Sequence, residues 1–311
     1  MDRFARDLDA LMAPETRIGI AVSGGPDSLA LLLLAATARP GQVEAATVDH
    51  GLREGGRAEA EMVAGVCEGI GVPHAILTVE WPERPATALQ ERARDARYAL
   101  LGQWVKDRHF DAVATGHHLD DQAETLVMRL NRGAGVRGLA GMRPAALVPG
   151  SGIPLLRPLL GWRRAELEQI VSDDGLKPVR DPSNADARFE RVRIRRALTE
   201  ADWLDPAALA ASAAHLGEAD AALDWIAESL ALARVTDDSE ALQIDAAGLP
   251  RELRRRFLRI AFARFHAAEP RGAELTRALE ALAEGRTVTL SGLKLEGGHE
   301  WRVTRAPPRR S

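Results

Sequence analysis

The segment RIGIAVSGGPDSLALLLLAA, residues 17–36, decides the fold of this chain. A short apolar run from Ile18 to Val22 stops at SGGPDS, residues 23–28, and an apolar segment without turn residues then continues to Ala36. This order predicts a strand, a tight loop and a helix. Consecutive glycines let the backbone approach a ligand, and the free N–H groups at the start of the next helix favour an anion. The loop is therefore a candidate phosphate-binding site.

The composition of this loop narrows the kind of phosphate site. It has neither the lysine of a Walker A loop nor the three spaced glycines of a dinucleotide fingerprint. Ser23 and Ser28 can donate hydrogen bonds to phosphate oxygens, whereas Asp27 would repel them unless a cation lies between, so Asp27 implies Mg²⁺. The alternative is an ordinary turn whose glycines serve packing and whose Ser28 caps the helix.

Strand and helix patterns alternate from residue 17 to about residue 160. We expect strands at 18–22, 43–48, 75–79 and 112–115, a weaker one at 153–156, and helices at 28–38, 57–70, 86–106 and 119–131. Strands separated by helices require right-handed crossovers and a parallel sheet covered on both faces. Residues 1–200 are therefore predicted to form a Rossmann-like α/β domain that includes a connecting helix.

Residues 201–311 are predicted to form a second, smaller and mainly α-helical domain. Strand signals nearly vanish after Asp205, and helical spacing of Ala and Leu dominates 206–233, 249–265 and 272–285. Residues 286–311 are expected to add a short hairpin and a basic tail. The segment 177–186 is rich in Pro, Asp, Ser and Asn and is predicted to be a loop. A length of 311 residues agrees with roughly two domains.

Composition indicates a globular, cytoplasmic protein that does not enter a membrane. Hydrophobic residues make up 46% and charged residues 28% of the chain, as in ordinary soluble proteins. The longest apolar run, 29–38, is about half a membrane span, and the N-terminus has no signal-peptide core. A lone Cys67 excludes an internal disulfide and a cysteine-rich metal or iron-sulfur site, and its apolar neighbours indicate a buried thiol.

The net charge of −4 argues against nucleic acid at first sight, but the charge is unevenly distributed. Residues 188–196 and 251–259 each contain five arginines. Phosphate-binding patches therefore remain compatible with the sequence. Aromatic residues are only 4% of the chain, so extensive base stacking on a sheet is not expected.

The segment TGHHLDDQAET, residues 115–125, begins at the end of a predicted strand and runs into a predicted helix. Ligands of open α/β sheets lie at this edge. The spacing of His117, Asp121 and Glu124 predicts that they share one helix face. Carboxylates there can hold Mg²⁺ or an ammonium group, and His117 can approach a phosphate or transfer a proton. The alternative is a solvated, acid-rich helix start, and His118 is equally compatible with a structural role.

Arginines occur at several further candidate positions. Arg94 and Arg97 lie three apart on the predicted helix 86–106, where they can clamp a phosphate or carboxylate. Salt bridges to Glu91 and Asp95 are the alternative. Glycines around Arg132 and Arg137 predict a mobile loop that can close over a bound ligand, or a plain connector.

The predicted helix beginning near Asp186, with Asp181 or Asn184 as its cap, places Arg188, Arg191 and Arg195 on one face. Such a face beside an active-site edge suits a nucleic-acid backbone, and a solvated basic face is the alternative. Asp49, His50 and Arg53 follow the second predicted strand. They should therefore meet the same carboxyl edge of the sheet as the first loop.

The SGGPDS loop resembles the pyrophosphate-binding loop (PP-loop) of the ATP pyrophosphatase superfamily, whose fold is adenine nucleotide α-hydrolase-like. Six further segments, in this order and spacing, resemble the tRNA(Ile)-lysidine synthetase family: VDHGLR (48–53), ARDARY (93–98), TGHHLDDQAET (115–125), RGAGVRGLAGM (132–142), RPLL (157–160) and DPSNADARFERVRIR (181–195). The resemblance covers about residues 15–200, is weaker in the helical remainder, and is to the shorter form of the family.

The resemblance implies an ATP-consuming ligase with Mg²⁺ as cofactor and a CAU-anticodon tRNA(Ile) and L-lysine as substrates. ATP adenylates the 2-carbonyl oxygen of the wobble cytidine, and the ε-amine of lysine then displaces AMP to leave lysidine. Residues 201–311 would bind tRNA, and a homodimer is compatible with the sequence.

The resemblance also implies roles for individual residues. ATP would be bound by Ser23, Gly24, Gly25, Pro26, Asp27, Ser28, Val48, His50, Arg97 and Gly116. The catalytic residues would be Asp27, Arg94, His117, Asp121 and Glu124, with Asp27 and Asp121 as metal ligands. tRNA would be bound by Arg53, Arg132, Arg137, Arg188, Arg191 and Arg195.

Other functions fit the sequence less well. A tRNA thiolation enzyme of the same superfamily would use cysteine pairs or a cluster, and this chain has one cysteine. A glutamine-fed amidotransferase would need an extra amide-hydrolysing domain, for which no room or catalytic cysteine motif remains. A non-catalytic RNA-binding protein would not need the intact loop 23–28 together with the acids of 115–125.

Overall fold

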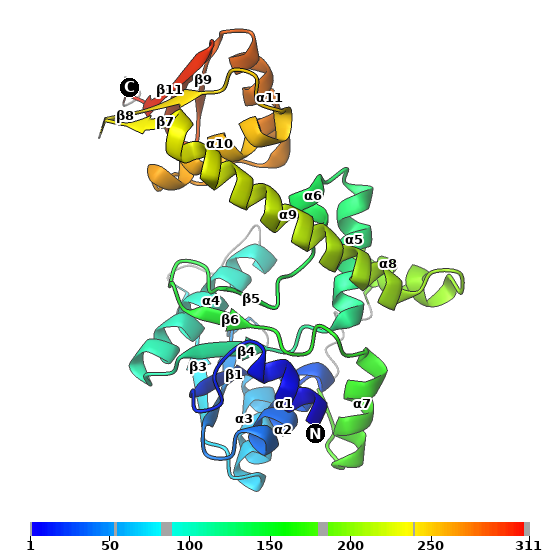
Figure 1. The fold of residues 1–311 in the computed structure, drawn as a ribbon. Coiled ribbons are helices and arrows are strands. Elements are labelled where there is room, and N and C mark those ends of the chain that lie inside the picture. The colour runs from blue at the N-terminus through cyan, green and yellow to red at the C-terminus, as the bar shows by residue number, and fades with distance from the viewer. Residues whose placement is uncertain (1, 53–54, 82–88, 180–185, 239, 308–311) are drawn as a thin grey trace. The chain divides into compact units, whose positions relative to one another are not determined.

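A computed structural model describes residues 2–52, 55–81, 89–179, 186–238 and 240–307 (Figure 1). The chain forms two compact units. The first comprises residues 1–133 and 138–214, and the second comprises residues 134–137 and 215–311. No helix within the described residues is long and apolar enough to cross a membrane.

The first unit is built on a six-stranded sheet of order β3-β2-β1-β4-β6-β5. Its strands are β1 (Ile18–Ala21), β2 (Val43–Asp49), β3 (His74–Thr78), β4 (Ala112–Thr115), β5 (Ala145–Leu147) and β6 (Pro154–Leu156). All pairs are parallel except β5 with β6. The predicted Rossmann-like parallel sheet is confirmed. Strand β5 was not predicted, because three residues with little burial carry no readable alternation.

Helices connect the strands as the sequence predicts. They are α2 (Pro26–Ala38), α3 (Gly55–Gly69), α4 (Leu89–Asp107) and α5 (Leu119–Asn131). Helix α2 begins at Pro26 with Gly25 as its N-cap, so the alternative of Ser28 as the N-cap is wrong. Helices α1 (Asp2–Asp9) and α7 (Arg164–Asp173) were not predicted.

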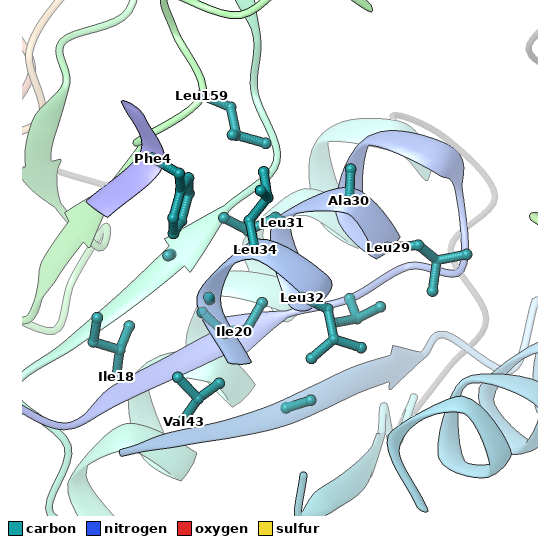
Figure 2. Packing of buried hydrophobic residues seen from close by; sticks show 14 of the residues in the cluster. Phe4, Ile18, Ile20, Leu29, Ala30, Leu31, Leu32, Leu34, Val43 and Leu159 are labelled. Carbon is teal, nitrogen blue, oxygen red and sulfur yellow. The ribbon is translucent and has the colours of Figure 1, made fainter. Parts of the chain in front are cut away.

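Helix α2 is the centre of the larger core. Figure 2 shows its leucines packed between Ile18, Ile20 and Val43 of the sheet and Phe4 and Leu159 on the other side. Because α2 is apolar around its whole circumference, it must be covered on all sides, and α1 and α7 complete that cover. Cys67 belongs to this core and is fully buried, as expected, and burial raises the pKa of its thiol to about 11.

The opposite face of the sheet is covered by α4. Tyr98, Leu101 and Trp104 of α4 pack there with Phe110. The Trp104 ring lies directly over Gly19 of β1, so that a Cβ atom at Gly19 would be 2.4 Å from Trp104 Cζ3. Only a glycine at this position allows α4 to approach the central strand so closely.

The second unit contains more β-structure than expected. Its helices include the C-terminal part of α9 (Pro206–Arg234), α10 (Arg251–Arg264) and α11 (Gly272–Ala283), which confirms the predicted helical content. Its five-stranded antiparallel sheet has the order β7-β8-β11-β10-β9, with β7 (Val235–Asp237), β8 (Ala241–Asp245), β9 (Thr287–Leu290), β10 (Leu293–Glu296) and β11 (Glu300–Arg305). The expected short hairpin is thus part of a full sheet, because alternate residues such as Leu242, Ile244, Trp301 and Val303 pack on α10 and α11.

One buried ion cluster ties two helices of this unit together. The Arg256 guanidinium of α10 pairs with Asp220 and Asp224 of α9. Leu253 and Phe257 of α10 are buried in the core of this unit, and Ile260 is partly buried against it.

Replacement of Gly19 by alanine should destabilise the first unit by about 1–3 kcal/mol, because the added methyl group forces Trp104 out of its position. Urea unfolding of the full chain measures this change. Gly65→Ala is the matched control: no atom lies within 4 Å of a Cβ there, and alanine in a helix interior should stabilise by about 0.5–1 kcal/mol. An equal effect of the two substitutions would contradict the packing.

Candidate active site

The carboxyl ends of β1, β2 and β4 surround a cavity of about 580 Å³. This is the edge at which parallel α/β sheets bind ligands. Nine of the residues proposed from the sequence line it: Ser23, Gly25, Asp27, Ser28, Val48, His50, Arg97, Gly116 and His117. The predicted ATP-binding residues Gly24 and Pro26 and the predicted catalytic residues Arg94, Asp121 and Glu124 do not line it, and Arg53 lies outside the described residues.

The loop 23–28 is held by its own polar groups. The Ser28 hydroxyl accepts a hydrogen bond from the Ser23 backbone N–H at 3.1 Å and donates one to the Gly25 carbonyl at 3.0 Å. Gly24 has a φ of +82°, which favours glycine, and its carbonyl accepts a hydrogen bond from Val179. The loop is therefore shaped before any ligand arrives.

Two loops meet at this cavity with almost no space between them. A Cβ atom on Gly116, which follows β4, would lie 2.8 Å from the Asp27 backbone oxygen. Only glycine fits at this point of contact. The position of Asp27 therefore depends on the loop after β4 as well as on its own loop.

The Asp27 carboxylate has one satisfied side and one open side. Its Oδ2 lies 3.6 Å from His118 Nε2, whereas its Oδ1 is buried without a hydrogen-bond partner. A buried carboxylate oxygen without a partner is costly unless a cation or donor reaches it. This orphaned oxygen fits a Mg²⁺ ligand.

His118 is the centre of an acidic cluster, which decides the role that the sequence left open. The imidazole is 1% exposed and lies 3.6–3.7 Å from Asp27, Asp120 and Asp121. Burial disfavours its charged form, but the three carboxylates outweigh burial and raise its pKa to about 10. His118 is thus an imidazolium that links the start of α5 to the loop 23–28.

Asp120 extends this cluster to α7. Its Oδ2 accepts a hydrogen bond from the Arg164 backbone N–H at 2.7 Å, and Arg163 lies 3.8 Å from Oδ1. Burial opposes ionisation of Asp120, but His118 and these groups outweigh it and lower its pKa to about 2. The cluster therefore connects the cavity to a helix that sequence analysis did not predict.

His117 occupies a different environment from its neighbour. It precedes α5, whose N-cap is His118, so the predicted helix face shared by His117, Asp121 and Glu124 is wrong for His117. It lies at the cavity because it follows β4 directly, and its Nδ1 is 2.9 Å from the Thr115 hydroxyl. Burial lowers the pKa of His117 to about 4. Nearby arginines lower the pKa further, whereas the negative charge of Asp121 raises it. His117 is therefore a neutral imidazole at pH 7.

Glu124 is 2% exposed and is fully engaged by arginines of α8 (Glu190–Glu200). Arg195 Nε donates to its Oε1 at 2.5 Å, and Arg191 Nε donates to its Oε2 at 2.7 Å. Arg191 also donates to Asp121 Oδ1 at 3.0 Å. Arg191 and Arg195 of α8 therefore face the acidic residues of α5, so the alternative of a solvated basic face is wrong for these two arginines. Glu124 is not freely accessible.

The other arginines proposed to bind tRNA lie in several places. Helix α8 begins at Glu190 and not near Asp186, so Arg188 precedes it, is exposed, and pairs with Asp186; the prediction of one face for all three arginines is wrong for Arg188. The proposed caps Asp181 and Asn184 lie outside the described residues. The actual N-cap, Phe189, has no side-chain cap.

The glycine-rich segment after α5 is not a plain loop. It contains the short helix α6 (Val136–Leu139), which includes Gly138. Arg132 pairs with Glu190 of α8 in the first unit, and Arg137 pairs with Asp224 in the second.

Arg94 and Arg97 share an aromatic platform. Their guanidinium carbons lie 4.9 Å and 5.1 Å from the centre of the Tyr98 ring. The alternative of salt bridges to Glu91 and Asp95 is not found among the described residues. Arg97, which lines the cavity, therefore presents positive charge there without a carboxylate of its own.

His50, which was predicted, follows the end of β2 at Asp49. Its carbonyl accepts a hydrogen bond from Trp81 Nε1 at 2.6 Å, and burial and Arg97 lower the pKa of its imidazole.

The cavity residues that were not predicted include Thr115 of β4 and Gln90 of α4. Gln90 also lines a second cavity of about 380 Å³, which is formed by Met128, Arg132, Phe189, Glu190, Arg191, Val192 and Arg195. Its position at the end of a strand could have identified Thr115, but nothing in the sequence marks Gln90.

Metal ligands are sparse. Within the ranges described, no group of three or more His, Cys, Asp or Glu side chains converges as a metal site. Mg²⁺ at nucleotide sites is commonly held by one or two carboxylates together with phosphates and water. The single open carboxylate oxygen of Asp27 is compatible with that kind of site and not with a preformed protein cage.

Replacement of Glu124 by glutamine should lower the free energy of unfolding by about 1–3 kcal/mol, because two charge-assisted hydrogen bonds to α8 are weakened. Chemical denaturation measures the change. Glu190→Gln is the matched control, since its pair with the exposed Arg132 should contribute less than about 1 kcal/mol. Equal losses in the two variants would contradict the role assigned to Glu124.

The His118→Gln substitution should give a pH-dependent loss of stability. The pKa of His118 is raised from 6.5 to about 10 on folding, so its contribution is fully present below pH 6.5 and is lost as the pH rises toward 10. The stability difference from the wild type should therefore narrow over that interval. Denaturation in EDTA across pH 6–10 measures it, and a pH-independent difference would show that His118 is not charged.

Comparison with known proteins agrees with this architecture. The PP-loop domain family model matches residues 1–202. A solved U34-tRNA thiolase, NcsA from Methanococcus maripaludis with its [4Fe-4S] cluster, is similar in fold: the TM-score is 0.58 at 18% identity, over 70% of this chain and 78% of that one.

Curated relatives match over nearly the whole chain. The tRNA(Ile)-lysidine synthase of Novosphingobium aromaticivorans is 51% identical, over 99% of this chain and 94% of that protein. That of Zymomonas mobilis is 42% identical, over 94% of this chain and 90% of its own length. A cavity at the sheet edge, the PP-loop and full-length similarity converge on one conclusion: the chain belongs to the tRNA(Ile)-lysidine synthase family.

Proposed function

We propose that this chain is a ligase that uses ATP to join L-lysine to the wobble cytidine of a CAU-anticodon tRNA(Ile), releasing AMP and pyrophosphate. The observation that carries the proposal is the cavity itself. It is bounded by the glycine loop 23–28 on one side and by Arg97, which has no carboxylate partner, on the other. Family membership supports the same reaction.

ATP would lie in this cavity with its phosphates toward the loop 23–28. Val48 and His50, at the end of β2, would contact the adenosine, and the backbone N–H groups at the start of α2 would receive the β- and γ-phosphates. Ser23 and Ser28 would stay hydrogen-bonded to each other and shape the loop. The α-phosphate would then lie between Asp27, Gly116 and His117 on one side and Arg97 on the other.

Mg²⁺ would be held by Asp27 through its open Oδ1. Asp121, whose Oδ1 accepts a hydrogen bond from Arg191 in the free protein, would be a second ligand once that arginine is released. When bound, the ion would supply charge neutralisation of the phosphates. His118, held by three carboxylates, would fix the orientation of both aspartates whether or not the ion is present.

The two chemical steps place different demands on the protein. In the first, the cytosine 2-oxygen forms a bond to the α-phosphorus and pyrophosphate leaves; Arg97 and Arg94 would stabilise the negative charge that develops. In the second, the lysine ε-amine attacks C2, AMP leaves with the oxygen, and the amine loses a proton. His117 is neutral at pH 7 and faces the cavity, so it can accept that proton.

The acidic residues of α5 would orient lysine. Asp121 and Glu124 can attract the ammonium groups of the incoming amino acid, but Arg191 and Arg195 occupy them in the free protein. We propose that tRNA phosphates compete for these arginines, with Arg53, Arg132, Arg137 and Arg188 as further contacts. Loss of the arginines to RNA would leave the carboxylates available for lysine.

The remaining assignments follow from this function. Residues 1–200 would carry catalysis and residues 201–311 would bind tRNA. We place the enzyme in the cytoplasm, where its tRNA and ATP are found, and regard a homodimer as compatible with the proposal.

Incorporation of labelled lysine into an unmodified tRNA(Ile) transcript tests the proposal. Incorporation should require ATP, and pyrophosphate release should require tRNA. Pyrophosphate release that does not depend on tRNA would contradict the assigned substrate. No ATP turnover under any condition would instead favour a protein that only binds RNA.

The Asp27→Asn variant should lose at least about 100-fold in the rate of pyrophosphate release, because the open carboxylate oxygen is the candidate Mg²⁺ ligand. Its unfolding free energy should stay within about 1 kcal/mol of wild type. Asp95→Asn, an exposed carboxylate on α4, is the control and should keep full activity. Normal turnover of Asp27→Asn would remove Asp27 from the metal site.

A further inference from the structure

The motif RPLL, residues 157–160, has no place in the function proposed above. Arg157 directly follows β6, which runs parallel to β4 with Leu156 opposite Ala114. It therefore lies at the same carboxyl edge as the loops 23–28 and 115–118. Its backbone N–H donates to the Pro144 carbonyl at 2.8 Å, and its Nη1 donates to the Arg143 carbonyl at 2.7 Å. The guanidinium is thus fixed to the chain segment before β5.

The burial of Arg157 is unusual for its charge. Three arginines are buried in the part of the chain that the structure describes: Arg39, Arg157 and Arg256. Arg39 pairs with Asp9, and Arg256 pairs with Asp220 and Asp224. Arg157 is 7% exposed, forms no ion pair with a carboxylate among the described residues, and has an Nε without a hydrogen-bond partner. A buried, unpaired charge is costly, so the fold keeps Arg157 against a stability penalty.

The neighbours of Arg157 are Tyr98 and further arginines. Tyr98 is 1% exposed, and its buried hydroxyl interacts with the Arg157 guanidinium. Burial lowers the pKa of Arg157. The Tyr98 hydroxyl opposes this shift and the positive charge of Arg94 adds to it, so both groups lie close to Arg157. Arg94 and Arg97 lie over the ring of the same Tyr98. Three guanidinium groups therefore surround one side chain.

This cluster opens into the cavity through Arg97. Arg97 lines the cavity, and its Nε is also buried without a partner. His117 lines the same cavity, and both Arg157 and Arg97 act against its protonation. The positive charge of Arg97, which forms no ion pair with a carboxylate in the part of the chain that the structure describes, thus reaches the cavity that the loop 23–28 also lines. An oxyanion in the cavity would balance it.

We propose that Arg157 is a positioning residue: fixed behind Tyr98, it supports the ring on which Arg94 and Arg97 lie and directs the Arg97 guanidinium toward the phosphates of ATP. The inference rests on the proposed function, because that function places ATP in this cavity. The carboxylate of lysine is a second oxyanion of suitable chemistry. Because residues of the loop 23–28 line the same cavity as Arg97, we favour the phosphates of ATP over the lysine carboxylate.

Calorimetric titration of the full chain with ATP, and separately with L-lysine, tests the inference. Arg157→Gln keeps a donor for the Arg143 carbonyl but removes the charge, and it should weaken ATP binding about ten-fold. Arg157→Lys restores the charge and should bring the affinity to within about three-fold of wild type. Arg39→Gln is the matched control: this arginine is equally buried but lies at the far end of α2, so the variant should lose stability without losing ATP affinity.

The possible outcomes distinguish a failure of the Arg157 inference from a failure of the proposed function. ATP affinity that is unchanged in Arg157→Gln would overturn the inference while leaving the proposed function intact. A loss of lysine affinity alone would overturn the assignment to phosphates. A wild-type chain that does not bind ATP would contradict the proposed function and the inference together. Equal loss in Arg157→Gln and Arg39→Gln would show an effect of stability only.

A second pair of variants covers failure of Arg157→Gln to fold. Tyr98→Phe keeps the ring on which the two arginines lie, whereas Tyr98→Leu removes it. Tyr98→Leu should weaken ATP binding about ten-fold and Tyr98→Phe should leave it within about three-fold of wild type. Equal ATP affinity of the two variants would overturn the inference.

Discussion

The packing of α2 against the central strands is the constraint on which the rest of the site depends. This helix is apolar on every side, so it can be placed only where the sheet, α1 and α7 cover it completely. Its first turn then has a fixed position over the end of β1, and the glycine loop that enters it has a fixed shape. An anion site made of backbone N–H groups needs this rigidity, because the donors cannot move to meet a ligand that arrives elsewhere.

Around that fixed loop, the protein distributes charge unequally. On the α5 side, carboxylates and cations compensate one another: His118 lies among three aspartates, and Glu124 holds two arginines of α8. On the α4 and β6 side, Arg97 and Arg157 have no carboxylate within the described residues. A nucleotide with bound Mg²⁺ carries both signs of charge and could complement both sides. The distribution of charge around the cavity therefore indicates a ligand that carries both negative phosphates and a cation.

Sequence patterns predicted much of the fold because α2, β1, β2 and β4 have strong, uninterrupted apolar runs. They failed where burial comes from distant partners. Strands β7 and β8 are short, and they depend on pairing with each other and with β11, which lies far away in the sequence. Helix α8 begins four residues later than expected because Asp186 accepts hydrogen bonds from the N–H groups of Arg188 and Phe189, which forms a turn before the helix.

The candidate site was predictable to a similar degree. Position after a strand located Asp27, His50 and His117, since the topology brings all three to one edge. Spacing could not show that Glu124 is occupied by Arg191 and Arg195, because that contact joins residues about seventy positions apart. Spacing also could not show that His117 and His118 differ in charge. The two adjacent imidazoles differ in charge only through the carboxylates that surround one of them.

The contact between Gly116 and the Asp27 backbone has a consequence for how this family can vary. A methyl group at position 116 would collide with main-chain atoms of Asp27, which cannot rotate away as a side chain can. The loop 23–28 and the loop after β4 therefore constrain each other's shape at the edge of the cavity. Substitutions in one loop must preserve the contact with the other, so we expect the two loops to evolve together although they lie about ninety residues apart in the sequence.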